Sequence, residues 1–385
     1  MSMRVVDTPY HSRRIGSLPG GCRLCVKGAK LVLLVTGVCS SRCWYCPLSE
    51  RKKNKDVVVA NEWWVKRDKD ILDEARLCDA EGAGITGGDP LCRLDRTLHY
   101  IRLLKRKFGR KFHIHLYTDG RHATPKAIAR LHSVGLDEIR FHPQFVKAGA
   151  DLRAVEEALK YDWDVGCEIP VVPNYFNETV KFIKEIDKLG VHFLNLNQME
   201  VSETNAKALL GRGYEAESDV SFAVKGSSET ADRLLKYCSK NTRLRVHYCT
   251  VKLKDGVQLR NRMKRRARNV AKEYDILTTE GLLIRGAIYL PETVPSFGYK
   301  EKVEGMKPAR KATLTRKISS AMRKIKSTYS LDSKLIELDE SRLRILTGAW
   351  IVEELAEGLK GIGLRPAVVE EYPTWDRLIT DLRIL

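Results

Sequence analysis

Three cysteines of this chain lie close together in a spacing that suits an iron–sulfur cluster. They are Cys39, Cys43 and Cys46, in the pattern C-x3-C-x2-C. Zinc sites usually combine a pair of ligands two to four residues apart with a second, distant pair. Three thiolates this close instead fit three irons of one cubane and leave the fourth iron open to a substrate or cosubstrate. The alternative is a structural zinc knuckle or a group of buried thiols.

This motif resembles that of the radical S-adenosylmethionine (radical SAM) superfamily, including the aromatic Tyr45 before the third cysteine. An apolar run over 31–35 leads into the cysteines. A second element, G-G-D-P over 87–90, resembles the Gly-Gly-Glu-Pro element of the family, with Asp89 in place of glutamate. The core resemblance covers about residues 30–200. The whole chain also resembles an archaeal branch related to pyruvate formate-lyase activating enzymes.

The resemblance implies the cofactors and the first chemical step. A [4Fe–4S] cluster on Cys39, Cys43 and Cys46 would bind the amino and carboxylate groups of SAM at its open iron. One electron, from a donor such as ferredoxin or flavodoxin, would then cleave SAM to methionine and a 5′-deoxyadenosyl radical. This chemistry belongs to the cofactors, and the protein positions and shields them.

The resemblance also suggests which residues contact SAM. Asp89 would accept a hydrogen bond from the methionine ammonium, and the glycines before it would permit close backbone approach. A turn of sequence Y-T-D-G over 117–120 resembles the Thr-Asn-Gly turn of the family. Polar residues of later strands would contact the ribose. The cofactor-binding candidates are Tyr45, Gly87, Gly88, Asp89, Pro90, Thr118, Glu168 and Asn197.

Strands and helices are predicted to alternate from residue 30 onward, which is typical of a parallel sheet with crossover helices. Six strand–helix units in this stretch predict an α/β fold, a partial (β/α)6 radical SAM barrel with an α+β C-terminal extension. The predicted strands cover 30–36, 82–86, 111–117, 137–142, 164–172 and 192–199. Helices are predicted over 63–80, 93–108, 124–134, 152–161 and 177–189.

Alternation within these strands places polar residues on one face. We expect the apolar face to meet the helices and the polar face to line the barrel. Buried polar groups must find partners, so a polar lining indicates a ligand cavity. The polar set comprises His113, His115, Tyr117, Arg140, His142, Asn195 and Asn197.

Three segments are expected. Residues 1–29 form an irregular N-terminal segment with a C-x2-C pair, residues 30–250 the barrel, and residues 251–385 a basic extension that ends in a small α/β part. No run of apolar residues is long enough to span a membrane. The start of the chain lacks the apolar core of a secretory signal. We therefore expect an anaerobic or well-protected cytoplasm.

Cysteines outside the motif suggest a second metal site. Cys22 and Cys25 precede the first barrel strand, and His247 and Cys249 follow the last barrel unit. A barrel brings its two ends together, so these residues would form a zinc site or hold an auxiliary iron–sulfur cluster, with Cys238 as an alternative ligand. The other interpretation is an ordinary strand that binds no metal.

The formal net charge is +19, and much of the basic excess is concentrated in segments without acidic residues, 51–55, 102–111, 260–269 and 307–326. Concentrated positive charge is typical of a nucleic-acid partner, although solvated helix faces have the same composition. The predicted RNA-binding residues are Arg260, Arg262, Lys264, Arg265, Arg266 and Arg268. An acidic part of the same chain is the competing partner.

Three functions follow from these observations. The first is modification of RNA, either tRNA or rRNA, by a radical SAM oxidoreductase or transferase. The second is modification of a protein, including activation of a glycyl-radical enzyme. The third is a non-catalytic, metal-stapled nucleic-acid-binding protein. The basic segments favour the first function.

Overall fold

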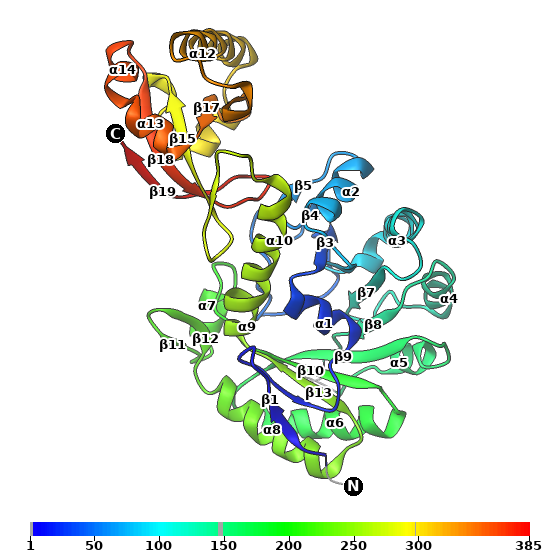
Figure 1. The fold of residues 1–385 in the computed structure, drawn as a ribbon. Helices are drawn as coiled ribbons and strands as arrows, with labels where there is room; N and C mark the ends of the chain where they lie inside the picture. Colours follow the sequence, from blue (N-terminus) through cyan, green and yellow to red (C-terminus); the bar gives the residue numbers. More distant parts are fainter. Residues whose placement is uncertain (1–2, 145–148, 297) are drawn as a thin grey trace. The chain divides into compact units, whose positions relative to one another are not determined.

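The computed structural model describes residues 3–144, 149–296 and 298–385 (Figure 1). The chain forms two compact units, Met1–Arg262 and Met263–Leu385. The division falls within helix α10 (Arg260–Val270), later than the boundary expected at residue 250. The N-terminal segment 1–29 is part of the first unit.

The first unit is built on an eleven-stranded sheet with a parallel centre (Figure 1). Six parallel strands have the same order in the sheet as in the chain. Strand β13 (Arg245–Cys249) continues the parallel pairing beyond the last of them. The predicted partial (β/α)6 barrel is confirmed. The six strands are β3 (Lys30–Thr36), β6 (Gly82–Gly87), β7 (His113–Thr118), β8 (Glu138–Phe141), β9 (Asp164–Val171) and β10 (Phe193–Gln198).

The crossover helices lie close to their predicted positions, with one exception. The segment predicted as a helix over 63–80 begins with strand β5 (Trp63–Trp64), which pairs with β4 (Val59–Ala60). Tryptophan favours strands, so the helix starts only after these residues. The crossover helices are α2 (Asp68–Leu77), α3 (Leu94–Phe108), α4 (Pro125–Ser133), α5 (Arg153–Ala158) and α6 (Phe176–Leu189).

The N-terminal segment is regular, so the prediction of an irregular segment is wrong. Strand β1 (Val5–Asp7) pairs with β2 (Arg13–Ile15), and β2 pairs antiparallel with β13. Helix α1 (Gly20–Lys27) follows and packs on β3, β6 and β7. Two glycines at its start oppose helix formation, so local propensity does not predict this helix. Its contacts with the barrel stabilise it instead.

The rest of the first unit connects β10 to the end of the sheet. Helix α8 packs on β9 and β10 and buries Leu234, Leu235 and Cys238 in the main core. The remaining elements are α7 (Ala206–Leu210), β11 (Ala216–Ser218), β12 (Ser221–Val224), α8 (Ser227–Asn241), α9 (Val251–Leu253) and a π-helical turn (Lys254–Leu259).

The second unit is an antiparallel sheet with helices, which confirms the predicted α+β extension. Strands β14 (Ile276–Leu277) and β15 (Leu283–Tyr289) form an antiparallel hairpin. In β15, Ile288 packs in one core with α12, while Ala287 and Tyr289 belong to another, as alternation along a strand requires. Its elements are β14 (Ile276–Leu277), β15 (Leu283–Tyr289), α11 (Tyr299–Glu304), α12 (Pro308–Thr328), β16 (Ile336–Asp339), β17 (Arg344–Thr347), α13 (Ala349–Glu354), α14 (Ala356–Gly361), β18 (Arg365–Glu371) and β19 (Ile379–Ile384).

A search of the helices in the described ranges finds none that is long and apolar enough to cross a membrane.

Candidate active site

The three motif cysteines lie in the loop that follows β3, at the carboxyl end of the parallel strands. Cys39, Cys43 and Cys46 are partly exposed, and none of them forms a disulfide. The carboxyl ends of barrel strands are where catalytic groups collect in this class of fold. The loop therefore has the position and the free thiols that a metal cluster requires.

Neighbouring groups donate hydrogen bonds to two of these sulfurs. The backbone N–H of Ser41 donates to Cys39 Sγ at 3.4 Å, and Gln144 Nε2 donates to Cys43 Sγ at 3.1 Å. Burial raises the pKa of Cys39 to about 12 and also raises the pKa of Cys43. Both thiols therefore keep their protons at neutral pH until a metal displaces them. The two donors can then stabilise the thiolates.

Aromatic and polar contacts fix the second half of the loop. Trp44 stacks on Tyr214 with ring centroids 5.6 Å apart. Tyr45 Oη lies 2.9 Å from His142 Nε2, at the end of β8. Asn205 donates to the backbone carbonyl of Tyr45 at 3.1 Å. The loop is therefore held by the ends of distant strands as well as by its own sequence.

The glycines of G-G-D-P are needed for packing within the chain. A side chain at Gly88 would overlap the carbonyl oxygen of Val38, and one at Gly87 would overlap that of Thr36. Gly88 N–H donates to Thr36 at 2.8 Å, and Asp89 N–H donates to Val38 at 2.9 Å. In this structure the two glycines thus permit close packing against the start of the cysteine loop, whereas their predicted approach to SAM stays a prediction.

Asp89, the predicted acceptor of the SAM ammonium, is fully buried, at 0% exposure, so its carboxylate presents no exposed oxygen in this structure. Its oxygens accept hydrogen bonds from Leu91 N–H at 2.8 Å, Thr118 Oγ1 at 2.9 Å and Asp119 N–H at 3.0 Å. Aspartate is one methylene shorter than glutamate, and here the carboxylate stays within the fold. Pro90 is buried beside it as the first residue of a 3-10 turn.

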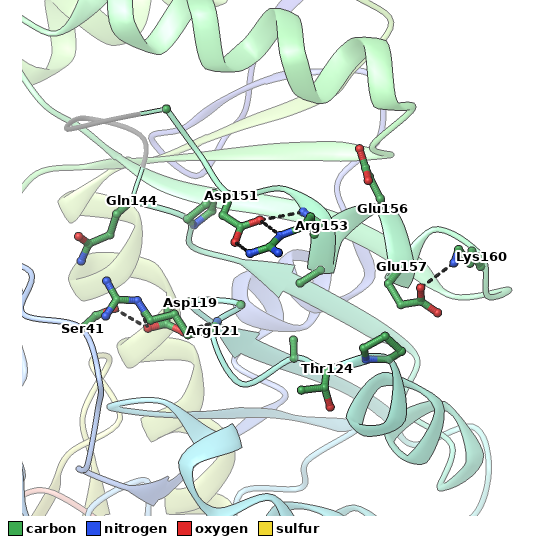
Figure 2. A pocket seen from close by; sticks show the side chains of 16 residues that line it. Ser41, Asp119, Arg121, Thr124, Gln144, Asp151, Arg153, Glu156, Glu157 and Lys160 are labelled. Carbon is green, nitrogen blue, oxygen red and sulfur yellow. Dashed lines mark hydrogen bonds and ion pairs between the residues drawn. The ribbon is translucent and has the colours of Figure 1, made fainter.

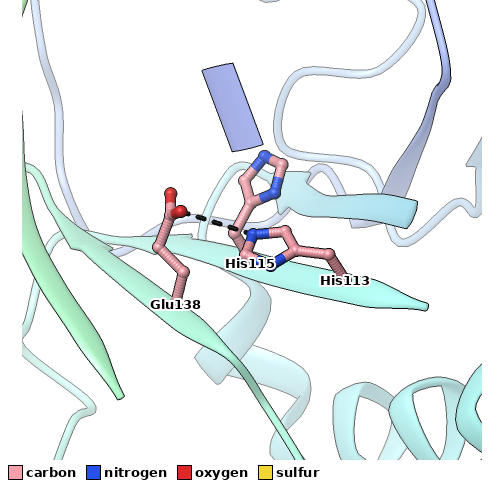
Figure 3. A group of neighbouring side chains, drawn as sticks. All are labelled: His113, His115 and Glu138. Atoms are coloured by element: carbon pink, nitrogen blue, oxygen red, sulfur yellow. Dashed lines mark ion pairs between the residues drawn. The ribbon is translucent and has the colours of Figure 1, made fainter. Parts of the chain in front are cut away.

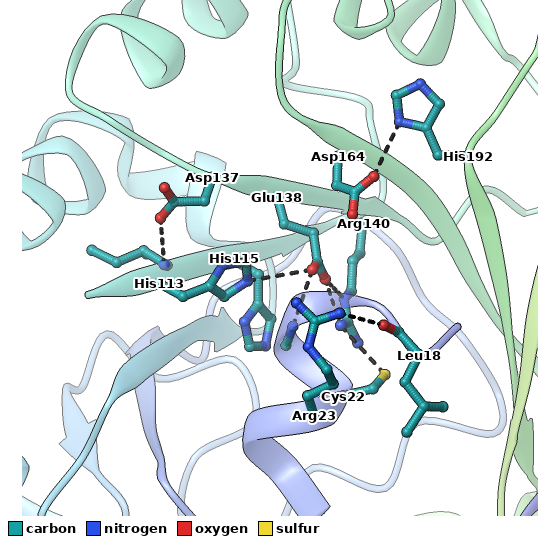
Figure 4. Close-up of polar contacts among 12 residues, drawn as sticks. Leu18, Cys22, Arg23, His113, His115, Asp137, Glu138, Arg140, Asp164 and His192 are labelled. Carbon is teal, nitrogen blue, oxygen red and sulfur yellow. Dashed lines mark hydrogen bonds and ion pairs between the residues drawn. The ribbon is translucent and has the colours of Figure 1, made fainter. Parts of the chain in front are cut away.

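Polar side chains of the barrel strands form a hydrogen-bonded network around Arg140, and Figure 4 shows its part at Glu138 and Cys22. Arg140, only 2% exposed, pairs with Glu138 at 2.5 Å and with Glu168 at 2.8 Å. Glu168 also accepts hydrogen bonds from Asn195 and Asn197, both at 2.9 Å. Burial alone would raise the pKa of Glu168, but Arg140 and the two asparagines lower it. The predicted ribose contacts, Glu168 and Asn197, are therefore adjacent and partly exposed.

Helix α1 fills part of the interior where a ligand cavity was expected. Side chains at Gly20 and Gly21 would collide with the rings of His113 and His115, so only glycine permits this approach. The Gly21 N–H donates to Glu138 Oε2 at 3.0 Å (Figure 4). No side-chain hydrogen bond caps the N-terminus of α1. The carboxylate of Glu138 on β8 instead accepts a hydrogen bond from a backbone N–H of its first turn.

The side chains of His113, His115 and Glu138 have the types and the spacing of a metal site (Figure 3). Their ligand atoms lie within 4.8 Å of one another. Arg140 holds the pKa of Glu138 well below its usual range although burial opposes this, and the same guanidinium neutralises the carboxylate. A cation would be repelled by Arg140 and by the positive end of α1. We therefore interpret His113, His115 and Glu138 as the group that caps the N-terminus of α1.

The predicted second metal site is not assembled as a tetrahedral zinc site. Within the described ranges, His113, His115 and Glu138 are the only metal-ligating set of three close enough to hold one ion. Cys22 Sγ instead accepts hydrogen bonds from Asn195 at 3.2 Å and Arg140 at 3.5 Å. Burial raises the pKa of Cys249 and the nearby Cys22 and Cys25 add to that rise, so these three cysteines share one neighbourhood. Gln258 approaches the sulfur of Cys249, His247 lies beside Ser12, and Cys238 is buried in the core on α8.

Arg262 and Arg266, two of the predicted RNA-binding residues, contact identified groups within the protein. Arg262 donates to both oxygens of Glu62, at 2.7 and 2.6 Å, and Arg266 is 3% exposed and donates to the carbonyl of Pro373. The predicted phosphate contacts of Arg262 and Arg266 are therefore corrected to internal contacts. Arg268 is exposed, and Arg260, Lys264 and Arg265 are partly exposed.

The pairing of Arg262 with Glu62 predicts a structural role. Changing Arg262 to glutamine is expected to lower the stability of the first unit by about 1.5–3 kcal/mol, because a charged, partly buried pair is lost. RNA affinity and its salt dependence should not change. Thermal unfolding and filter binding at two salt concentrations measure these effects, with exposed Arg268→Gln as the control. If the Arg262→Gln variant melts like the wild type and binds RNA more weakly, the predicted contact of Arg262 with RNA phosphates would be supported instead.

Sequence reasoning missed three contributors to this site. Gln144 reaches Cys43 from the segment after β8, and Ser41 bonds Asp119 at the end of β7. Arg121 donates to the carbonyl of Ser40 at 3.1 Å. Asp119 stands in the recognisable Y-T-D-G turn, which was a usable signal. No local pattern marks Gln144 or Arg121.

Comparisons with known proteins agree with this location of the site. A family model described as the radical SAM superfamily matches residues 33–186, and one described as a domain of unknown function, DUF8061, matches residues 311–382. A protein of Methanocaldococcus jannaschii, named a candidate glycyl-radical enzyme activating enzyme, is 43% identical over 285 residues. The match covers 72% of this chain and 75% of that protein.

Two solved structures show more distant similarity. SuiB of Streptococcus suis bound to S-adenosylmethionine has a TM-score of 0.41 at 11% identity, covering 58% of this chain and 50% of SuiB. Coproporphyrinogen III oxidase (HemN) of Escherichia coli has a TM-score of 0.37 at 11% identity, covering 58% and 56% of the two chains. The present chain thus spans about half the length of these solved proteins.

Proposed function

This chain belongs to the radical SAM superfamily, an enzyme family that uses a [4Fe–4S] cluster and SAM, and we propose that it generates a glycyl radical in a partner protein. The observation that carries this proposal is the archaeal relative, 43% identical and covered over three quarters of its length, which is named for that activity. The predicted modification of RNA gains no support from the comparisons. Internal pairing of Arg262 and Arg266 weakens it further.

The cluster would be held by Cys39, Cys43 and Cys46. Reduced by a donor such as ferredoxin or flavodoxin, the bound cluster supplies the electron that splits SAM into methionine and a 5′-deoxyadenosyl radical. The N–H groups of Ser41 and Gln144 point at two of the sulfurs. Hydrogen bonds to sulfur and solvent exposure tune the reduction potential of such clusters. These two residues therefore help to set the potential at which the enzyme accepts its electron.

The chain also positions and shields the reacting groups. Glu168 and Asn197 offer a carboxylate and an amide at the carboxyl ends of β9 and β10, suited to ribose hydroxyls. His142 connects Tyr45 to this pair. Its ring bonds to the hydroxyl of Tyr45 and contacts the backbone carbonyl of Glu168 at 2.7 Å. Helix α1 fills the opposite end of the barrel and excludes water there. A radical formed at the open end is thereby protected from the interior side.

In the proposed reaction one hydrogen atom moves from the Cα of a partner glycine to the 5′ carbon. The products are 5′-deoxyadenosine and a glycyl radical, so atoms and electrons balance. Positioning and exclusion of water are what this protein contributes to such a transfer.

Deuterium transfer tests the proposal and identifies the class of substrate. Reduced enzyme with its cluster is incubated with SAM and either protein labelled with [2-²H₂]glycine or deuterated RNA, both from the source organism. We expect 5′-deoxyadenosine to gain deuterium from the labelled protein, together with a glycyl-radical signal in electron paramagnetic resonance. Cys43→Ala enzyme is the control without SAM cleavage. Deuterium that comes only from RNA would contradict the proposal and support RNA modification.

A further inference from the structure

We propose that the amino-acid end of SAM is held in this chain by Asp119, which receives the ammonium, and Arg121, which receives the carboxylate. Asp89, the residue that replaces the family glutamate, then has a supporting role. The inference concerns the binding of SAM and does not depend on which substrate loses its hydrogen.

The burial of Asp89 leaves the ammonium without its expected acceptor. No water-sized probe reaches Asp89, and three donors from the chain itself occupy its oxygens. Two of those donors, Thr118 Oγ1 and Asp119 N–H, belong to the turn after β7. Asp89 thus fastens this turn to the G-G-D-P element, and the next carboxylate toward the open end is Asp119.

Asp119 is the more acidic of the two aspartates. Burial and a hydrogen bond with Asp119 raise the pKa of Asp89 to about 7. Burial would also raise the pKa of Asp119, but hydrogen bonds with Asp89, with Ser41 and with the N–H of Arg121 lower it. Two adjacent carboxyls that share a proton ionise one at a time. Asp119 therefore loses its proton before Asp89 as the pH rises, which suits an acceptor for an ammonium.

Asp119 contacts the loop that carries the motif cysteines. Its carboxylate accepts a hydrogen bond from Ser41 Oγ, whose residue lies between Cys39 and Cys43. A cluster held by these cysteines would therefore have the Asp119 carboxylate beside its loop. Through its backbone N–H and its side chain, Asp119 connects the G-G-D-P element, the end of β7 and the cysteine loop.

Arg121 supplies the opposite charge. Its Nε lies 3.8 Å from Asp119 Oδ2, and its guanidinium donates to the carbonyl of Ser40 at 3.1 Å. The side chain remains 52% exposed, so a ligand can reach it. An α-amino acid carries its ammonium and carboxylate on the two sides of one carbon. Asp119 and Arg121 likewise present opposite charges close to each other. The carboxylate of Asp119 can pair with the ammonium of the ligand while the guanidinium of Arg121 pairs with its carboxylate.

Both residues line the same cavity (Figure 2). Its volume is about 680 Å³, which is within the range of small-molecule sites. Ser41 and Gln144, the neighbours of the motif sulfurs, line it as well. The cavity therefore opens on the cysteine loop. Arg153, another arginine that lines the cavity, pairs with the exposed Asp151.

Binding of two ligands to the reconstituted, unreduced enzyme tests the assignment without turnover. The probes are SAM and decarboxylated SAM, which keeps the ammonium and lacks the carboxylate. Loss of a charge-assisted hydrogen bond weakens binding by about tenfold or more. We expect Asp119→Asn to weaken the binding of both ligands by that factor. Arg121→Gln should weaken the binding of SAM alone and leave that of decarboxylated SAM within twofold of wild type.

The control is Arg153→Gln, which removes another arginine of the same cavity and should change neither affinity. Iron content and melting temperature accompany each measurement. The proposal is overturned if Asp119→Asn enzyme with full iron binds SAM within twofold of wild type. It is also overturned if Arg121→Gln weakens the binding of both ligands equally, a result that remains decisive if Asp119→Asn takes up no iron.

Discussion

Changing Cys43 to alanine is expected to abolish SAM cleavage and to prevent stable assembly of the [4Fe–4S] cluster. Cys43 is the middle ligand of the three, and Gln144 donates to its sulfur at 3.1 Å. Two remaining thiolates leave two irons of the cubane without protein ligands. The rate of 5′-deoxyadenosine formation should fall to background, and iron should fall well below four per chain. Chromatography of the nucleoside products and metal analysis measure the two effects.

Cys92 provides a matched control for this prediction. It is a partly exposed cysteine outside the motif, yet its sulfur lies 3.8 Å from Ser40 Oγ in the same loop. Cys92→Ala enzyme should keep its cluster and its turnover, which separates ligation from general disturbance of the loop. Full cluster content and turnover in Cys43→Ala enzyme would refute the ligand assignment.

Changing Arg140 to leucine is expected to destabilise the barrel by about 3–5 kcal/mol, because the variant leaves the buried Glu138 and the partly exposed Glu168 without their cation. Glu138 is 0% exposed and also accepts the hydrogen bond that begins α1. The variant should therefore loosen α1 as well. Thermal unfolding measures the first effect, and hydrogen exchange of the amides of α1 measures the second.

The pH dependence of the Arg140→Leu variant distinguishes electrostatic loss from poor packing. In the wild type Arg140 depresses the pKa of Glu138, so this pair contributes stability above the unfolded pKa of glutamate and loses it only in acid. In the variant burial raises the pKa of Glu138, so the carboxyl is destabilising once pH exceeds its unfolded pKa, about 4.3. The deficit should therefore be smaller at pH 5.5 than at pH 7.5.

Two comparisons complete this experiment. Adding Glu138→Gln to the leucine variant should recover part of the loss at pH 7.5. Arg153→Leu removes an arginine whose side chain is 87% exposed and which pairs with exposed Asp151, and it should change stability by less than about 0.5 kcal/mol. An equal deficit at both pH values would assign the effect to packing.

The sequence by itself determined the family, the architecture of the barrel and the loop that carries the cysteines. These features depend on local patterns. The spacing of Cys39, Cys43 and Cys46 is read directly, and strands such as β3 and β9 are continuous apolar or alternating runs. Parallel strands joined by helices leave few arrangements open. The polar face of the strands was also predictable, because alternation decides which residues share a side.

What fills the interior was decided only by the tertiary structure. Helix α1 begins with Gly20 and Gly21, which oppose a helix locally and become necessary only because the rings of His113 and His115 lie against them. Likewise, the letters G-G-D-P do not reveal that Asp89 is sealed by donors from another strand.

The same physical reason explains the arginines of α10. Six basic residues in one segment resemble a phosphate-binding surface when read along the chain. Arg262 nevertheless meets Glu62, two hundred residues earlier, and Arg266 meets the carbonyl of Pro373. A charge pattern records which groups are present, whereas their partners depend on contacts between segments that are far apart in sequence. Only the folded chain determines those contacts, and with them the surface and the cavity that remain for a ligand.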